Sequence, residues 1–298
     1  MVLTLIFLAV LLAVSAAVID VGGWYRAHRA TQATADATAL AGAQNLPDST
    51  DAARALALDY AGRNGGGVKT PDVTFESDIT AADTIKVTAR RSVPGLFTKL
   101  FGMGSVTARS VAKARVGALG QAKWAAPIGV DYRHDMLHCT PSLNCNPEFN
   151  TDTTIDFVKV GPGAFRLINI DGSQGGVGPQ TLGDWISDGL NGYMDRNKWY
   201  YSDPGMKPDS SHVKDALDSR IGVGKELLLP IYNNTRAQGS GFAYYVVGWV
   251  GFYVSGYDIR GAKNAIISGH FTEIIWDGIQ SERGNDEDFG ARSVELVQ

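Results

Sequence analysis

Hydrophobic residues follow three different patterns along the chain, and the first is an unbroken apolar run. Residues 1–19, MVLTLIFLAVLLAVSAAVI, contain no charged side chain. A helix needs about 20 apolar residues to cross the hydrocarbon core of a bilayer. We therefore predict a transmembrane anchor over residues 1–23, which includes Asp20. Trp24 and Tyr25 follow at the membrane–water interface, where such amphipathic rings are enriched.

The second pattern, from residue 24 to Leu46, predicts a helix with few large apolar side chains. Small residues recur at helical spacing, and Leu40 is the one large apolar member of their stripe. The stripe consists of Ala27, Ala30, Ala33 or Thr34, Ala37, Leu40 and Ala41. Such a stripe allows a second helix to come very close. It fits packing against a partner helix and packing against the helix's own domain equally well.

Shorter helical and alternating segments then predict a small α+β module that ends at residue 117. Residues 50–62 have helical periodicity, with Ser49 or Thr50 as the N-cap and Gly62 at the end. Strands are predicted at 71–76, 84–91 and 105–116, and a short helix at 94–101 behind Pro94. In the last strand, the even-numbered residues from Val106 to Val116 share one face. The other face is largely basic and fits either solvent or a contact with lipid headgroups or an acidic partner.

The third pattern, residues 118–298, is rich in glycine, proline and asparagine and predicts a loop-rich β-dominated domain. Short helices are expected at 182–190 and 210–222, and strands at 226–233, 241–259 and 264–278. Residues 246–254 are apolar at both alternating positions, which predicts a central strand buried on both faces. The charged tail 281–298 is expected to be exposed, with 293–297 as an edge strand. The predicted fold class is α+β, with domains at 1–23, 24–117 and 118–298.

Charge and cysteine content narrow the function classes. Residues 1–120 carry 12 Lys and Arg against 9 Asp and Glu, and residues 121–298 carry 15 against 22. Neither part is basic enough to indicate nucleic-acid binding. The two cysteines, Cys139 and Cys145, bracket a turn-like Thr-Pro-Ser-Leu-Asn stretch, which predicts a local disulfide and an oxidising, extracytoplasmic compartment. Two reduced thiols in a cytosolic protein are the alternative.

The orientation of the anchor rests on conflicting signals. Arg26, His28 and Arg29 follow the apolar run, so the positive-inside rule alone predicts a cytoplasmic bulk. The predicted disulfide favours the opposite orientation, which we adopt, and we expect a short basic stub to be missing before Met1. A signal peptide cleaved near Ala17 is the alternative to an anchor, but a basic leader is absent and the apolar stretch is longer than usual.

The span ending in AVIDVGGWY, the basic spacer and the run QATADATALAGA together resemble the N-terminal segment of TadE/TadG-like proteins of the Flp (tight adherence) pilus-assembly system. In that family the span ends in Asp-Val-Gly before an aromatic residue, and an Ala-rich Asp-containing run follows. The matching positions are Asp20, Gly22, Tyr25, Asp36, Ala37, Ala39, Leu40, Ala41 and Ala43. The motif covers about the first 45 residues, and the stretch 68–127 is also similar to the family's continuation.

Two family features differ here. Position 5 is Leu rather than the Glu of processed pilins, and no prepilin-peptidase site precedes the span, which argues against prepilin processing. Larger members carry a von Willebrand A-type domain whose metal site begins with Asp-x-Ser-x-Ser. The nearest match, DGSQG, has Asp171 and Ser173 but Gly175 in place of the second serine, which argues against such a site.

One string has the spacing of a zinc protease. His134 and His138 are four residues apart in HDMLHC, with Asp135 in place of the glutamate that serves as the general base. The segment lacks a long helical pattern and a third ligand, so a polar turn beside the disulfide is the preferred interpretation. Asp184, Asp188 and Asp195 have the spacing of one side of a helix or its exit and could bind a cation, but solvated helix faces usually have the same pattern. No residue is assigned a catalytic role, and no cofactor is expected.

These observations and the resemblance imply a non-enzymatic, single-pass component of Tad-type pilus assembly in the cytoplasmic membrane, with most of the chain outside. Its expected partners are the bilayer, through residues 1–23, and other pilus-assembly or pilin-like membrane proteins, and not nucleic acid. The expected helix-packing residues are Asp20, Gly22, Tyr25, Ala33, Asp36, Ala37, Leu40 and Ala41. The alternatives are an anchored metal-dependent hydrolase that uses His134 and His138, and a secreted adhesin.

Overall fold

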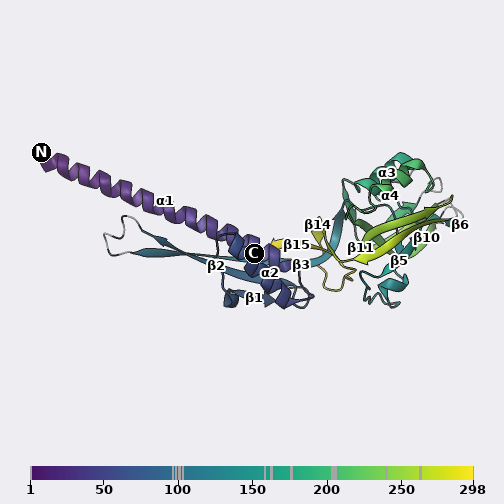
Figure 1. Ribbon diagram of the computed structural model, residues 1–298, viewed down its shortest axis with the longest axis horizontal. Coiled ribbons are helices and arrows are strands. Elements are labelled where there is room, and N and C mark those ends of the chain that lie inside the picture. Colours follow the sequence, from purple (N-terminus) through teal and green to yellow (C-terminus); the bar gives the residue numbers. More distant parts are fainter. Residues whose placement is uncertain are drawn as a thin grey trace. The chain divides into compact units, whose positions relative to one another are not determined.

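The computed structural model describes residues 2–297 except 96, 98, 100, 101, 103, 158, 162, 163, 175, 176, 203–206, 239, 240, 262 and 263. It has the predicted α+β class, with one long helix first and mainly strands after residue 117 (Figure 1). The helices are α1 (Val2–Ala43), α2 (Thr50–Arg63), η1 (Thr70–Asp72), η3 (Asp135–Leu137), α3 (Pro179–Ser187) and α4 (Ser211–Asp218). The strands are β1 (Val73–Glu76), β2 (Thr84–Pro94), β3 (Ser105–Lys123), β4 (Val130–Asp131), β5 (Asp152–Asp156), β6 (Lys159–Gly161), β7 (Ala164–Phe165), β8 (Tyr193–Asp195), β9 (Lys198–Ser202), β10 (Leu227–Gln238), β11 (Gly241–Ile259), β12 (Ala265–Thr272), β13 (Ile274–Ile275), β14 (Gly278–Gln280) and β15 (Ala291–Val297).

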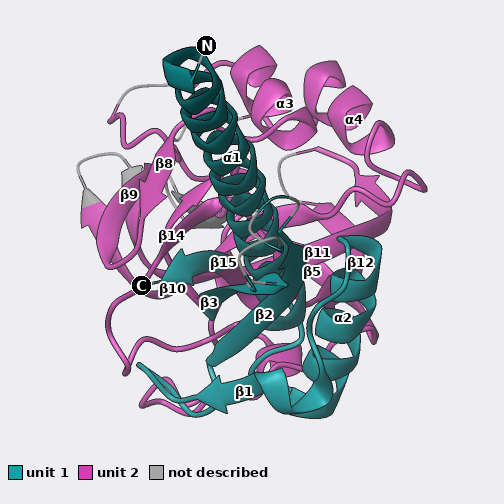
Figure 2. Cartoon of the chain, turned by 90° about the vertical axis from the view of Figure 1, so that its left-hand side faces the viewer, with its two compact units in different colours: residues 1–116, 294–298 teal, residues 117–293 magenta. Residues whose placement is uncertain are grey.

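The chain forms two compact units (Figure 2). Unit 1 comprises residues 1–116 together with 294–298, and unit 2 comprises residues 117–293. Unit 1 is therefore discontinuous in sequence, because the end of β15 returns to the module that the first 116 residues build. The division into domains at 23 and 117 stays a prediction, since compactness alone does not establish independent folding.

The core of unit 1 is built mainly from small side chains. Ala35, Ala39 and Ala43 of α1 are fully buried, together with alanines of α2 and residues of β2 and β3. Gly42 marks the closest approach, because a Cβ atom placed there would lie 2.5 Å from Ile85 Cδ1 and 3.0 Å from Ala57 Cβ. The last third of α1 thus packs tightly on its own module, as one of the two sequence-based alternatives requires.

Helix α2 begins and ends close to the predicted positions. Ser49 is its N-cap, and the Ser49 hydroxyl accepts a hydrogen bond from the backbone N–H of Ala52 at 3.1 Å. This bond satisfies one of the backbone donors that a helix start leaves free. The helix continues one residue past Gly62 to Arg63, and Asn64 forms the C-cap. The prediction of a capped helix over 50–62 is confirmed.

Strands β2 and β3 form a long antiparallel hairpin beside α1. Its ladder runs without a bulge from the pair Thr84–Arg115 to the pair Pro94–Ser105. Alternation predicted the faces of β3 correctly near the core, where the even-numbered residues from Ser110 to Val116 are buried. The expected helix start at Pro94 is wrong, because the residue ends β2 and its missing N–H is tolerated at a strand terminus. Residues 96, 98, 100 and 101 of the expected helix lie outside the described part of the chain.

The turn before β2 is organised by a buried aspartate. Asp83 is 1% exposed, and its carboxylate accepts hydrogen bonds from the backbone N–H groups of Asp78, Ile79 and Thr80 and from the Thr84 hydroxyl, at 2.7 to 2.9 Å. Burial raises the pKa of Asp83, but the donated hydrogen bonds outweigh it and leave the pKa below its usual range. The ionised side chain therefore holds the turn together.

Unit 2 is built around a sheet with the strand order β4-β10-β11-β12-β5, in which β9 also pairs with β11. Strand β11 is the central strand, and residues 246–252 together with Val254 are buried. This confirms the buried central strand that was predicted from apolar residues at both alternating positions. The predicted helices within 182–190 and 210–222 are also present as α3 and α4, and Ser210 caps α4.

The last segment of the chain differs from its expected exposure. Phe289 is 1% exposed and packs in the core of unit 2, although the segment around it is rich in charged residues. Strand β15 lies between β3 and β13 in the sheet order and is not an edge strand. The charged composition concealed these buried positions, because the apolar residues of the tail are few and widely spaced.

Candidate functional site

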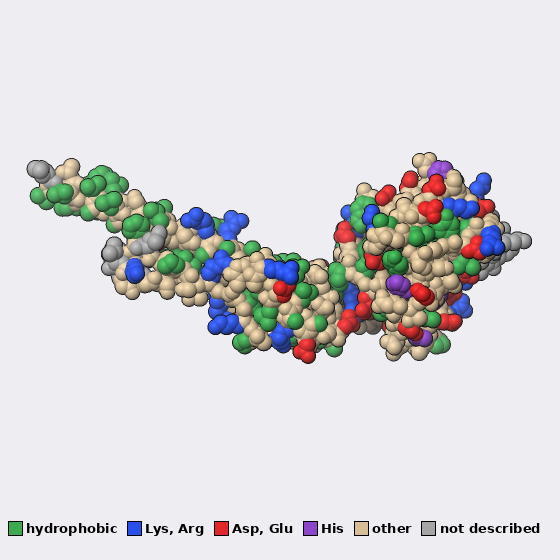
Figure 3. Space-filling view, viewed as in Figure 1, with side chains coloured by type: hydrophobic (Ala, Val, Ile, Leu, Met, Phe, Trp, Pro, Cys, Tyr) green, Lys and Arg blue, Asp and Glu red, His purple; other side chains and the backbone are tan. Residues whose placement is uncertain are grey.

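The first half of α1 is an exposed apolar rod. Residues 2–19 contain no charge, and nearly all of them are exposed. Figure 3 shows apolar side chains along this part of the helix before the first lysine or arginine. At 1.5 Å per residue these 18 residues extend about 27 Å, close to the thickness of a bilayer core. Among the described residues, α1 is the one helix long and apolar enough to span a membrane, which is consistent with a single-pass anchor.

A packed face begins where this apolar half ends. Asp20 is 4% exposed, and its Oδ2 atom accepts a hydrogen bond from the backbone N–H of Phe97 at 3.0 Å. Intervals of three and four residues place a series of partly or fully buried residues on the same side of α1. We call this series the packed face: Asp20, Trp24, Ala27, Thr31, Thr34, Thr38 and Gly42.

The hydroxyls of Thr31 and Thr34 on the packed face are hydrogen-bonded close to the helix. Thr31 donates to the Ala27 carbonyl at 2.8 Å, and Thr34 is 2.6 Å from the Asn64 carbonyl oxygen at the end of α2. Each bond pairs a polar group that would otherwise be costly to bury. The alanine stripe does not coincide with this face, and the helical spacing of Thr31, Thr34 and Thr38 is the signal in the sequence that marks it.

The opposite side of α1 is more open. We call it the open face: Gly22, Arg26, Arg29, Ala33, Asp36 and Leu40. Gly22, Arg26, Arg29 and Ala33 are exposed, whereas Asp36 and Leu40 are half-buried.

The predicted helix-packing residues do not form one surface. Gly22, Ala33, Asp36 and Leu40 belong to the open face. Asp20 and Ala41 are buried, Ala37 is half-buried, and Tyr25 is 62% exposed. The role of the predicted set in packing against another protein stays a prediction.

Residues 1–45 match a known protein family. The family model, Tad, is described as "Putative Flp pilus-assembly TadE/G-like". The match confirms the resemblance predicted from the sequence, and it covers α1 and the start of the turn that follows. We call these residues the Tad segment. Comparisons with curated proteins and with solved structures found no match. The Tad segment supports a role related to Flp pilus assembly.

Outside the Tad segment, the two cysteines form the predicted disulfide. Cys139 and Cys145 are bonded to each other, and no free cysteine is present in the described chain. The disulfide closes a short loop after η3. Its presence is what an oxidising compartment favours.

The two histidines of the protease-like string lie at opposite ends of η3, which is a 3-10 helix of three residues. His134 is the N-cap of η3, and His138 is its C-cap in the left-handed conformation. The ring of His134 accepts from the Met136 N–H at Nδ1 and contacts the Thr154 carbonyl through Nε2 at 3.1 Å. A zinc protease requires both histidines on one face of a longer helix. The geometry indicates that His134 joins η3 to β5.

The remaining contacts of this region also fit a structural role. His138 Nε2 lies 3.3 Å from a carboxylate oxygen of Glu148. The Thr151 hydroxyl and then His138 lower the pKa of Glu148. Within the described residues, no group of three or more His, Cys, Asp or Glu side chains could hold a metal ion.

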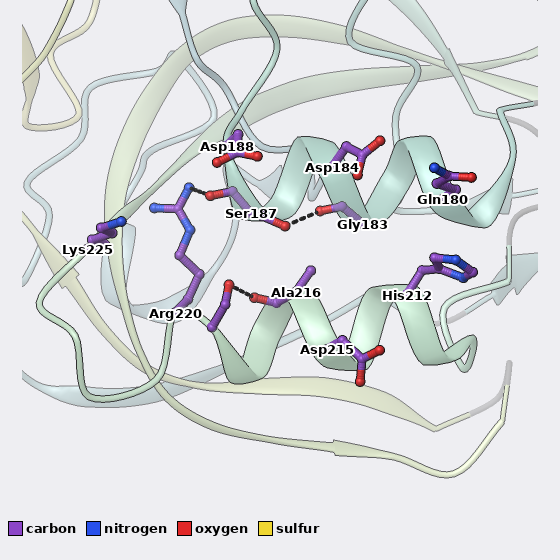
Figure 4. A pocket seen from close by; sticks show the side chains of 11 residues that line it. Gln180, Gly183, Asp184, Ser187, Asp188, His212, Asp215, Ala216, Arg220 and Lys225 are labelled. Carbon is purple, nitrogen blue, oxygen red and sulfur yellow. Dashed lines mark hydrogen bonds between the residues drawn. The ribbon is translucent and has the colours of Figure 1, made fainter.

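The aspartates considered for cation binding are divided between two places. Asp184 and Asp188 line a groove of about 450 Å³ between α3 and α4, together with Asp215 and Arg220 (Figure 4). Asp195 lies on β8, where it accepts a hydrogen bond from Gln121 and pairs with Lys198. The expectation that the three aspartates share one helix side or its exit is therefore wrong, because the chain forms a strand after α3.

Arg220 has a structural role in the groove between α3 and α4. Its guanidinium donates to the carbonyls of Ile186, Ser187 and Glu226 at 2.5 to 3.2 Å. Two of these carbonyls lie at the end of α3, where helices have unpaired acceptors. Burial lowers the pKa of Arg220, although Asp188 and Glu226 oppose this effect. The side chain fastens α3 to the segment after α4.

Asp171 and Ser173 of the von Willebrand-like string form a local turn. The Ser173 N–H donates to the Asp171 carboxylate at 2.9 Å, a common arrangement of an aspartate with the backbone two residues on. Gly175, the third position of the string, lies outside the described residues.

Proposed function

We propose that this chain is a non-enzymatic, membrane-anchored component of Flp/Tad-type pilus assembly. The observation that carries the proposal is the coincidence of the family match with α1, since residues 1–45 contain both the apolar half and the packed half of the helix. The apolar half anchors the chain in the cytoplasmic membrane. The packed half fixes the anchor to the module of unit 1.

The bulk of the chain lies outside the cytoplasm in this proposal. The Cys139–Cys145 disulfide supports this orientation, because cytosolic thiols are kept reduced. Mass spectrometry of the membrane fraction tests the anchor directly. We expect peptides from residues 1–23 in the intact membrane-bound protein, and their loss with a new terminus near Ala17 would instead favour a secreted adhesin.

The open face of α1 provides the contact with other pilus-system helices. Small residues at Gly22 and Ala33 leave room for a neighbouring backbone, while Arg26, Arg29 and Asp36 supply charges that can select a partner. Gln32 donates to the Asp36 carboxylate at 2.7 Å, so this charge is held in place on the helix surface. The face combines close approach with charge selection.

The first experiment is a count of surface pili by electron microscopy in a strain that lacks this chain and in the complemented strain. Total pilin is measured alongside. We expect few or no fibres with a normal pilin level in the deletion strain. Unchanged fibre number would overturn the proposed role in assembly.

A pair of substitutions then tests the open face. Ala33→Trp places a bulky ring on the exposed side of α1, whereas Ala55→Trp places the same ring on the exposed side of α2 in the same module. We expect Ala33→Trp to reduce fibre number several-fold and Ala55→Trp to leave it unchanged. Limited proteolysis of both variants verifies that the module remains folded. Equal fibre numbers in the two variants would exclude this face as the contact surface.

A further inference from the structure

The hairpin of β2 and β3 ends beside α1 at the point where the apolar half stops. Its ladder closes at Pro94 and Ser105, and Gly95 and Gly104 continue it with a backbone hydrogen bond of 3.4 Å. The Phe97 N–H then donates to Asp20 at 3.0 Å. Asp20 is the one buried residue among residues 2–30 of the described helix. The hairpin end is therefore fastened to a defined level of α1.

That level coincides with the expected surface of the bilayer. The uncharged residues 2–19 span about 27 Å, so a membrane that surrounds them ends near Asp20. Trp24 and Tyr25 follow about one turn later, in the zone where amphipathic rings are enriched. Because the Phe97 N–H donates to the Asp20 carboxylate, Phe97 lies at the level of α1 where the boundary between acyl chains and headgroups is expected.

The hairpin end has the chemistry of a surface that contacts lipid. Phe97 is 38% exposed, although it is a large apolar side chain close to the buried Asp20. Residues 95–104, GLFTKLFGMG, carry a single charge, that of the exposed Lys99, and no acidic group. Exposed cations of α1, Arg26 and Arg29, follow Asp20 within ten residues. Cations near the membrane surface attract anionic headgroups.

We propose that Phe97 and Lys99, which follow β2, form a second membrane contact, in which Phe97 inserts into the acyl–headgroup boundary and Lys99 binds anionic phosphate groups. Asp20 acts as the positioning residue that holds the hairpin end at this depth. The inference rests on the proposed membrane anchor, because the bilayer around α1 is the surface that the hairpin reaches. Continuity with that span favours lipid over a protein as the occupant.

A second membrane contact restricts the rotation and tilt of α1 in the bilayer. A single helix can rotate about its axis and tilt in a bilayer, and neighbouring contacts set these angles. With the hairpin end also at the surface, rotation of α1 would pull Phe97 out of the boundary or push it deeper. The two contacts together therefore give the open face of α1 a preferred direction in the membrane plane.

Site-specific labelling of the full chain in vesicles tests the proposal. Both native cysteines are in the disulfide, so a single introduced cysteine provides the one free thiol for an environment-sensitive fluorophore. We choose Phe97→Cys for the hairpin end, Val14→Cys for the apolar half of α1 and Thr80→Cys for the turn before β2. Thr80 is exposed and lies beyond the far end of β2, whose ten residue steps extend about 33 Å.

The vesicles contain phosphatidylethanolamine and phosphatidylglycerol, and quenching is measured with nitroxide lipids and with aqueous iodide. We expect the labels at positions 14 and 97 to be quenched by nitroxide lipids and shielded from iodide several-fold relative to position 80. Addition of Asp20→Ala should make the label at position 97 accessible to iodide and leave position 14 unchanged. An unchanged position 97 in that variant would refute the positioning role of Asp20.

The outcomes separate this proposal from the anchor on which it rests. Lipid quenching at position 14 with free iodide access at position 97 overturns the hairpin contact and leaves the anchor standing. Iodide access at both positions overturns the anchor as well. A label at position 97 that is shielded in native membranes but exposed in vesicles of the purified chain would show a protein partner, and it would overturn the lipid contact.

Discussion

The tight crossing at Gly42 makes a quantitative prediction about how α1 is held on its module. Gly42→Ala would place a Cβ atom 2.5 Å from Ile85 Cδ1, 3.0 Å from Ala57 Cβ and 3.1 Å from the Ala53 carbonyl oxygen. Favourable contacts between carbon atoms occur at about 3.5–4.0 Å. Ile85 and Ala57 are both fully buried, so neither can turn towards solvent. The substitution must therefore move α1 away from α2 and β2.

The expected free-energy change is the difference between two effects. Adding a methylene-sized group to a packed core costs about 1–3 kcal/mol. Replacing glycine by alanine inside a helix contributes about 0.5–1 kcal/mol in the opposite direction. We therefore expect Gly42→Ala to destabilise the packed half of α1 by about 1 kcal/mol. The control Gly62→Ala meets no atom within 4 Å, so it should retain only the helix-favouring effect.

Hydrogen exchange of the full chain in detergent micelles measures the prediction. Amide protection in residues 31–43 and in β2 reports local opening of unit 1. We expect faster exchange in Gly42→Ala and equal or slower exchange in Gly62→Ala, a difference of about 2 kcal/mol between the variants. Equal protection in the two variants would show that the crossing is loose and that our account of the helix position is wrong.

Three further substitutions test other contacts. Asp83 has a lowered pKa in the folded state, so its contribution to stability is complete above about pH 4 and is lost as the pH falls through that lower pKa. Asp83→Asn should therefore reduce the acid-dependent loss of stability measured by thermal unfolding. An unaltered pH profile would contradict this expectation. Arg220→Met leaves three carbonyls without their donor and should lower the free energy of unfolding, measured with denaturant, by about 2–4 kcal/mol. The control Lys225→Met, at an exposed residue of the same groove, should change it little. His134→Ala should lower stability by about 1–2 kcal/mol through the loss of two hydrogen bonds, with no change in bound zinc by elemental analysis; a loss of zinc would revive the hydrolase alternative.

Local patterns predicted the elements whose determinants are close together in sequence. The Ser49 cap and the helical period give α2, and the two-sided apolar run gives the central part of β11. The uncharged run at the start of α1 needs no partner to be recognised. Each of these features depends on residues within one or two turns or within one strand.

Long-range contacts could not be obtained in this way. Asp20 and Phe97 are 77 positions apart, and no local rule pairs them. The alanine stripe does not by itself locate the packed face of α1, whereas the hydroxyls of Thr31 and Thr34, which are hydrogen-bonded within unit 1, lie on the buried side. Pro94 predicts a helix start because proline is tolerated in the first turn of a helix, but a strand terminus tolerates it as well.

The discontinuity of unit 1 has a consequence for the order of events during synthesis. Strand β15 pairs with β3, and Oε1 of Glu295 in β15 lies 3.1 Å from Nη2 of Arg115 in β3. The ribosome must add about 180 residues after Arg115 before this strand exists, which takes roughly 10–40 s at bacterial rates of 5–20 residues per second. Throughout that interval the side of β3 that later pairs with β15 has unpaired backbone groups. An unpaired edge of this kind is a template for pairing with another chain, so β15 protects unit 1 from such pairing only after the last residues are made.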